Sequence, residues 1–138
     1  MKKYEWEKCS NIPDFPTMKK QTKQQLRKRA DTLLQDYTKK NNQYCLVCAE
    51  PMYCGHHFVT KAASNALRYY IPNIIPICKH CHCLVHNQPH LVEPKICFLL
   101  GKEWYDDLIK VKQEGVKANL FWYQSNVETL EKLLGGEK

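Results

Sequence analysis

Two Cys-x-x-Cys pairs constrain the fold of this chain more than any other feature of its sequence. Cys45 and Cys48 form the first pair, Cys78 and Cys81 form the second, and 29 residues lie between the pairs. Two such pairs can surround one tetrahedral zinc ion, with two thiolates from each. In a chain of 138 residues, whose core is modest, such an ion contributes folding free energy. We therefore predict a structural zinc ion on these four cysteines.

The other cysteines leave two alternatives open. Eight cysteines allow a disulfide framework by number alone, although close-spaced pairs mixed with histidines favour metal binding. Cys54 and Cys83 lie close enough to the pairs in sequence to replace one zinc ligand, so the exact ligand set stays open.

The sequence shows neither a secretory signal nor a membrane-spanning segment. No apolar segment follows the charged residues 1–7, as a secretory signal requires, and no apolar stretch is long enough to span a membrane. We expect a cytoplasmic protein without a membrane partner, in which cysteines are rarely paired as disulfides.

Four histidines lie inside the cysteine frame. His82 and His86 are four residues apart, so on a helix both imidazoles project from one face and can bind one metal ion. His56 and His57 are adjacent, so on a strand they point to opposite faces. One of them can then bind a metal ion while its neighbour faces a water molecule. Hydrolysis of a phosphodiester bond needs this combination of a cation and a base with a pKa near neutral.

Positive charge gathers before the cysteine frame. Residues 17–42 hold eight lysines and arginines against Asp31 and Asp36, a net charge of +6 in a chain whose total is +7. Apolar residues recur there at helical spacing, and Lys23 and Arg27 fall largely off that apolar stripe. This pattern favours a helix that offers cations to a polyanion. The alternative is a solvated basic face without a partner.

The chain divides into four predicted segments. They are a tail over 1–17, a basic amphipathic helix over 18–42, a core over 43–92, and a C-terminal helical extension over 93–138 that packs on the core. The core is predicted to contain, in order, a strand over 52–60, a loop over 61–68, a strand over 71–77 interrupted by Pro72 and Pro76, and a helix over 79–87. In the extension, two amphipathic helices are predicted over 101–114 and 118–134. The predicted fold class is α+β.

Over about residues 44–88, this pattern resembles the zinc-framed HNH endonucleases, also known as the ββα-metal or His-Me finger family. The match consists of a Cys-x2-Cys pair, the His-His pair, and the run Asn-x4-Cys-x2-Cys-His-x3-His from Asn73 to His86. The resemblance implies an endonuclease that hydrolyses DNA, with a β-hairpin and a helix clamping one catalytic divalent ion. By resemblance that ion is Mg²⁺ or Mn²⁺, although imidazole ligands by themselves also suit Zn²⁺ or Ni²⁺.

The resemblance also implies a role for each matching residue. His56 and His82 bind the catalytic ion, and His86 matches an additional helix ligand found in the nuclease-colicin branch. His57 is the general base, and Asn73 fixes the loop geometry and orients that base.

A narrower similarity concerns the loop between the strands. Gly55-His56-His57, with Leu67-Arg68-Tyr69 before Asn73, is similar to phage NinG-type recombination nucleases, which implies DNA processing in a bacterial or phage-infected cell. The predicted nucleic-acid contacts are Arg68, Lys61, Lys23 and Arg27. For Arg68 the alternative is an ordinary surface cation.

Two other functions are compatible with the same residues. The first is a non-catalytic, zinc-stabilised nucleic-acid-binding module, which explains the cysteines and the basic helix but not the four histidines. The second is an interaction protein that uses zinc only for folding. The sequence leaves open whether the protein is a monomer or a homodimer, and which DNA it prefers.

Overall fold

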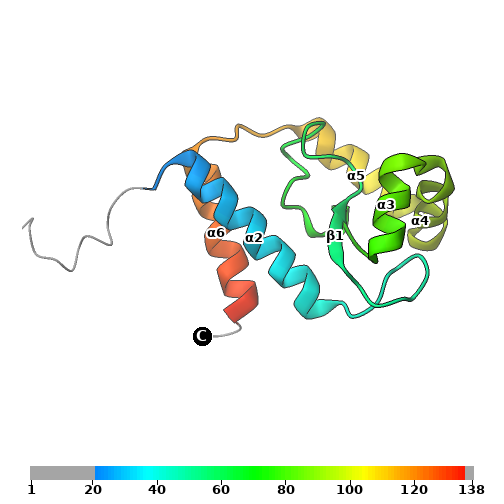
Figure 1. Ribbon diagram of the computed structural model, residues 1–138. Helices are drawn as coiled ribbons and strands as arrows, with labels where there is room; N and C mark the ends of the chain where they lie inside the picture. Colours follow the sequence, from blue (N-terminus) through cyan, green and yellow to red (C-terminus); the bar gives the residue numbers. More distant parts are fainter. Residues whose placement is uncertain (1–20, 136–138) are drawn as a thin grey trace, which may run out of the picture.

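The computed structural model of this protein describes residues 21–135, and they form an α+β fold, as predicted (Figure 1). The predicted tail over 1–17 lies outside the described residues. In chain order the α-helices and strands are α2 (Lys23–Asn41), β1 (Cys54–His57), β2 (Ile74–Ile77), α3 (Lys79–Asn87), α4 (Glu93–Leu100), α5 (Lys102–Glu114) and α6 (Leu120–Gly135). Two short 3-10 helices, η2 (Ile71–Asn73) and η3 (Pro89–Leu91), complete them.

Helix α2 begins at a capping box. Thr22 is extended and its hydroxyl accepts a hydrogen bond from the N–H of Gln25 at 3.1 Å. The Gln25 side chain accepts one in return from the N–H of Thr22 at 2.9 Å. Helix α2 therefore starts at Lys23, and residues 18–20 of the helix predicted over 18–42 lie outside the described residues.

Helices α2 and α6 lie side by side and share one apolar core (Figure 1). One face of each helix forms this core, together with Tyr69 from the loop between the strands and Ile74 from β2. Its buried members are Leu26, Ala30, Leu33, Leu34, Tyr69, Ile74, Tyr123, Val127 and Leu130. An exposed ion pair, Arg29–Glu131 at 2.6 Å, also links the helices, but such pairs contribute at most about 1 kcal/mol. Apolar burial therefore holds α2 against α6.

The two strands pair antiparallel, and each is shorter than predicted. Gly55 lies opposite Pro76, and His57 lies opposite Ile74. The carbonyl of Pro76 points away from β1, since it accepts a hydrogen bond from the N–H of Leu46 at 2.9 Å. Pro76 thus occupies a position whose N–H the ladder does not use, so it lies within β2 instead of interrupting it. Pro72 falls in η2, before the strand begins.

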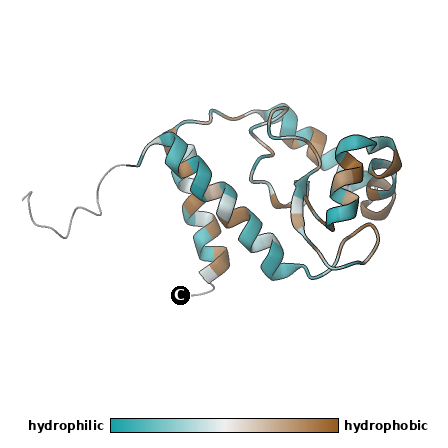
Figure 2. Ribbon diagram, in the orientation of Figure 1, coloured by the Kyte–Doolittle hydropathy of each residue, from teal (hydrophilic) through white to brown (hydrophobic). Residues whose placement is uncertain are grey.

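A second core joins β2, α3 and α4. It contains the buried cysteines with Ile75, Ile77, Val85, Val92 and Ile96. Helix α4 lies in the segment predicted as a helical extension, although the two helices predicted there begin only at residue 101. Proline is favoured in the first turn of a helix, which is its position in α4. Figure 2 shows α4 as largely hydrophobic and α2 as largely hydrophilic on the side in view.

The C-terminal segment packs on both cores. Trp104 of α5 lies against the second core, and its indole N–H donates to the carbonyl of Pro72 at 2.7 Å. Helix α6 packs on α2 in the first core. Over residues 21–135, none of the helices has the length and apolar character needed to cross a membrane.

Gly55 is a position where a side chain has no room. A Cβ atom there would lie 2.6 Å from Cγ2 of Ile74 and 3.1 Å from Cγ2 of Thr38. We expect Gly55→Ala to lower the free energy of unfolding by about 1–3 kcal/mol, because either α2 or β2 must move. Urea unfolding measures this change. In an Ile74→Ala background the same substitution costs less, and equal costs in both backgrounds contradict the explanation.

Candidate metal centres

The four predicted zinc ligands converge at the start of α3. Each of Cys45, Cys48, Cys78 and Cys81 offers a sulfur, and all four sulfurs lie within 4.8 Å of one another. The Sγ atom of Cys48 lies 3.5 Å from that of Cys78 and 3.7 Å from that of Cys81. All seven cysteines in the described residues are free, so this part of the chain holds no disulfide framework. Cys54 and Cys83 do not belong to the group.

Local backbone geometry orients these sulfurs. The N–H of Val47 donates to Sγ of Cys45, and the N–H of Cys81 donates to Sγ of Cys78, both at 3.3 Å. Cys78 is also the N-cap of α3, so the second knuckle and the helix begin together. In the first knuckle Ala49 has a φ of 67°, a left-handed conformation that lets the chain turn back after Cys48.

The electrostatics of the group fit a bound cation. Burial raises the pKa of Cys45, but hydrogen bonds from backbone N–H groups outweigh this effect and lower the pKa to about 7. Burial and the neighbouring thiols raise the pKa of Cys81. Four thiols this close oppose one another's ionisation, and a dication removes this opposition by binding the thiolates. The residues therefore fit zinc, which favours four thiolates.

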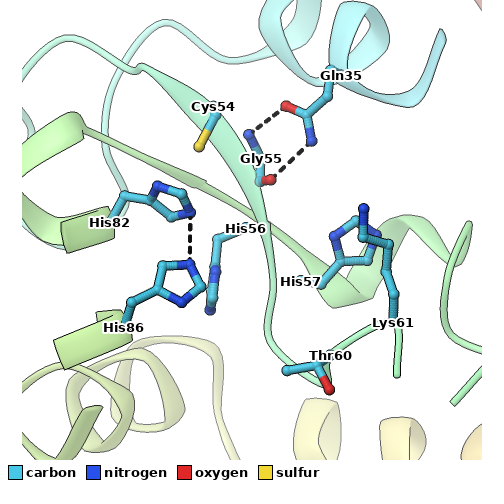
Figure 3. A pocket seen from close by; sticks show the side chains of 9 residues that line it. All are labelled: Gln35, Cys54, Gly55, His56, His57, Thr60, Lys61, His82 and His86. Carbon is cyan, nitrogen blue, oxygen red and sulfur yellow. Dashed lines mark hydrogen bonds between the residues drawn. The ribbon is translucent and has the colours of Figure 1, made fainter. Parts of the chain in front are cut away.

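Three of the four predicted histidines form a second group, which Figure 3 shows. His56 extends from β1, while His82 and His86 extend from one face of α3, and the three ligand nitrogens lie within 4.8 Å of one another. The Nε2 atoms of His82 and His86 are 3.0 Å apart. The ring of His56 meets both helix rings edge-on, with centroids 5.6 and 5.3 Å away.

Two histidines of the group, His56 and His82, have lowered pKa values that favour the neutral ring. Burial, followed by the charges of His82 and His86, lowers the pKa of His56 to about 4. Burial also lowers the pKa of His82. Neutral imidazole is the form that binds metal ions. No carboxylate of the described residues belongs to the group. This donor set suits Zn²⁺ or Ni²⁺ better than Mg²⁺, which prefers oxygen ligands.

His57 points away from His56, toward the opposite side of β1 (Figure 3). Its Nε2 atom lies 2.9 Å from the carbonyl oxygen of Arg68. A carbonyl oxygen only accepts, so Nε2 carries the proton and Nδ1 keeps a free lone pair. Burial lowers the pKa of His57 more than this carbonyl raises it. The ring is thus held neutral, in one tautomer, beside the metal-ligand group.

Asn73 is fully buried and fixes both ends of the loop between the strands. Its side-chain N–H2 donates to the carbonyls of Val59 and Leu67, each at 3.1 Å. Its side-chain oxygen accepts from the N–H of Val59 at 2.8 Å. These contacts tie the residues after β1 to the residues before β2. In the part of the chain that the structure describes, no buried side-chain nitrogen or oxygen lacks a hydrogen-bond partner.

A pocket of about 310 Å³ opens around the histidines, and one side of it comes from α2. Gln35 lines it and pairs with the main chain of Gly55 through two hydrogen bonds of 2.9 Å, one donated and one accepted (Figure 3). Its amide covers the free edge of β1 as a third strand would. Sequence reasoning missed Gln35, and its only signal is its position between the buried Leu34 and Thr38.

The predicted nucleic-acid contacts separate into three cases. Lys61 is exposed and lines the pocket beside His57 (Figure 3). Arg68 lies in the same loop, but its guanidinium binds Asp31 of α2, with 2.7 Å between Nη2 and Oδ2. Lys23 and Arg27 do not line the pocket. Lys23 lies roughly 18 Å along the helix axis from Gln35, at the rise of an α-helix.

No family model, curated protein or solved structure matches this chain. Its function must therefore be argued from the two groups of metal ligands and the residues around them.

We expect the purified protein to bind about one zinc ion through its cysteines. Cys78→Ser should abolish that binding and lower the melting temperature, because each knuckle supplies part of the folding free energy. Elemental analysis and thermal unfolding measure both effects. The matched control is Cys83→Ser, an exposed cysteine on the same helix, which should keep its zinc. Equal zinc loss in both variants contradicts the ligand assignment.

We expect a second, weaker site for Ni²⁺ or Co²⁺ on the histidine group. His56→Ala should reduce affinity at that site by at least about tenfold, because it removes one of three donors. Calorimetric titration of the zinc-loaded protein measures this loss. His80→Ala removes an exposed histidine of α3 that lies outside the group, so it should bind like the wild type. A similar loss in His80→Ala contradicts the site.

Proposed function

We propose that this protein is a metal-dependent endonuclease of the HNH type, which hydrolyses phosphodiester bonds of DNA. The observation that carries the proposal is the division of β1 into two chemical faces. His56 joins His82 and His86 in a ligand group on one face, and His57 stands beside it on the other with a free Nδ1. A zinc-stapled binding module needs no such arrangement.

His57 supplies the base. Its Nδ1 accepts a proton from a water molecule whose oxygen attacks phosphorus. The bond from phosphorus to the 3′ oxygen breaks, and that oxygen takes a proton from solvent. The products are a 5′-phosphate and a 3′-hydroxyl. When bound to the three-histidine group, a divalent cation would offset the charge that grows on the phosphate and on the leaving oxygen.

Other residues of the pocket fit a phosphate substrate. Lys61 offers an exposed cation that lines the pocket beside His57, where it can bind a phosphate oxygen. Asn73 keeps the loop that carries Lys61 attached to β2. The +6 charge over 17–42 raises the local concentration of a polyanion, and its effect should weaken with salt.

The arrangement of elements supports the same proposal. Strand β1, a loop held by an asparagine, strand β2 and helix α3 follow one another, with ligands on the first strand and on the helix. This is the order that the sequence resemblance implies for the HNH core. The three-imidazole donor set leads us to propose a transition-metal ion such as Mn²⁺, Ni²⁺ or Zn²⁺ ahead of Mg²⁺.

Nicking of supercoiled plasmid tests this proposal. We expect the zinc-loaded wild type to nick DNA when a second divalent ion is added, and His57→Ala to do so at least about 100-fold more slowly. Zinc content and melting temperature should be unchanged in the variant. His90→Ala, an exposed histidine outside the pocket, is the control and should cut normally.

Three outcomes count against the proposal. If His57→Ala cleaves DNA as fast as the wild type, His57 is not the general base. If the products carry 3′-phosphate ends, the bond from phosphorus to the 3′ oxygen is not the one that breaks. If no protein cuts but all of them shift DNA in a gel with steep salt dependence, the non-catalytic binding module is the better account.

A further inference from the structure

We propose that Asp31 of α2 is a positioning residue for His57, acting through Arg68. The inference rests on the proposed role of His57 as general base, and it adds to the site an element outside the histidine and cysteine pattern. Asp31 contacts neither the three-histidine group nor the pocket. Its geometric link to His57 is Arg68, which it holds in an ion pair.

Arg68 joins two contacts that matter for His57. Its main-chain carbonyl accepts the hydrogen bond from Nε2 of His57 at 2.9 Å. Its guanidinium forms a fork on the carboxylate of Asp31, with 2.7 Å between Nη2 and Oδ2 and 3.1 Å between Nε and Oδ1. Arg68 therefore supplies both groups. Its carbonyl oxygen sets the tautomer of His57, and its guanidinium is anchored to α2.

The ion pair between Arg68 and Asp31 is partly shielded from solvent. The side chain of Arg68 is only 13% exposed and that of Asp31 is 30% exposed. Two parallel hydrogen bonds fix the guanidinium plane as well as its distance. The hydroxyl of Tyr69 lies 3.1 Å from Nε of Arg68 and donates to the carbonyl of Arg27 at 3.4 Å, a further contact to α2. Arg68 thus has little freedom relative to this helix.

Attachment of α2 does not by itself require this pair. An apolar core holds α2 against α6, and Gln35 holds it against β1. Before Arg68, the loop is fixed at the carbonyl of Leu67 by Asn73. The peptide that carries the Arg68 carbonyl is held on one side by the buried Tyr69 and on the other by the ion pair of Arg68 with Asp31. Of the two, the ion pair is the contact that Asp31 supplies.

A displaced carbonyl would change what His57 can do. Without the acceptor at Nε2, the ring can rotate or carry its proton on Nδ1, the nitrogen that must accept a proton from water. Displacements of about 1 Å at a reacting group cost as much as about 100-fold in rate. Binding of DNA depends on other residues, so a positioning role predicts a fall in kcat with little change in KM.

Steady-state cleavage kinetics test the proposal first. We expect Asp31→Asn to lower kcat at least about tenfold while KM for DNA stays within about twofold. Asp31→Glu keeps the charge and should recover part of the loss. It also serves as the second variant if Asp31→Asn does not fold. Glu131→Gln removes the exposed Arg29–Glu131 pair between α2 and α6 and should leave kcat unchanged.

A double substitution separates positioning from general stability. In a His57→Ala background there is no ring to position, so Asp31→Asn should cause no further loss of residual activity. A further tenfold loss in that background overturns the proposal. Wild-type kcat in a folded Asp31→Asn variant, with His57→Ala still inactive, also overturns it while leaving the proposed function intact.

Nitrogen NMR of the histidine side chains gives a readout that does not depend on cleavage. In the zinc-loaded wild type, His57 should show a single tautomer with its proton on Nε2, and in Asp31→Asn it should show a mixture. An unchanged single tautomer in Asp31→Asn overturns the inference. If the wild type does not cut DNA, the proposed function fails, and the tautomer measurement still decides whether Asp31 positions this ring.

Discussion

The convergence of four thiols at the start of α3 is the interaction on which the rest of the site depends. Cys78 and Cys81 belong to the first turn of that helix, and Cys45 and Cys48 belong to a turn that is tied to β2 by the Leu46–Pro76 hydrogen bond. The group therefore fixes where α3 begins relative to the sheet. Four residues into the helix, His82 is then directed at His56. One set of sulfurs thereby determines whether three imidazoles can meet.

The second constraint is the two-sided nature of β1. Adjacent residues of a strand face opposite ways, so His56 and His57 cannot serve the same group. His56 turns toward α3, and His57 turns toward the loop that Arg68 anchors on α2. The strand is only four residues long, and its outer edge is covered by the amide of Gln35. A short strand can hold two functional side chains because helices support it on both sides.

Several parts of this arrangement could be predicted from residue spacing. The spacing of Cys-x-x-Cys and of His82 and His86 depends on local geometry, which a tight turn or one helical turn determines without help from the rest of the chain. The α3 helix and the two amphipathic helices of the C-terminal segment follow from periodicity for the same reason. Gly55 is different, because its lack of a side chain has meaning only where Ile74 and Thr38 approach. Pro94 shows the same limit, since one residue type suits both a loop and the first turn of α4.

The sequence by itself indicated the two Cys-x-x-Cys pairs, the His82–His86 pair and the opposition of His56 and His57, because each follows from a spacing of a few residues along the chain. Only the tertiary structure decided that α2 contributes to the histidine site. The contacts of Gln35 with Gly55 and of Asp31 with Arg68 join residues 20 and 37 positions apart, and no local periodicity encodes such pairs. It also decided that Arg68 is held in an ion pair, because a cation's partner is fixed by packing and not by its neighbours in sequence.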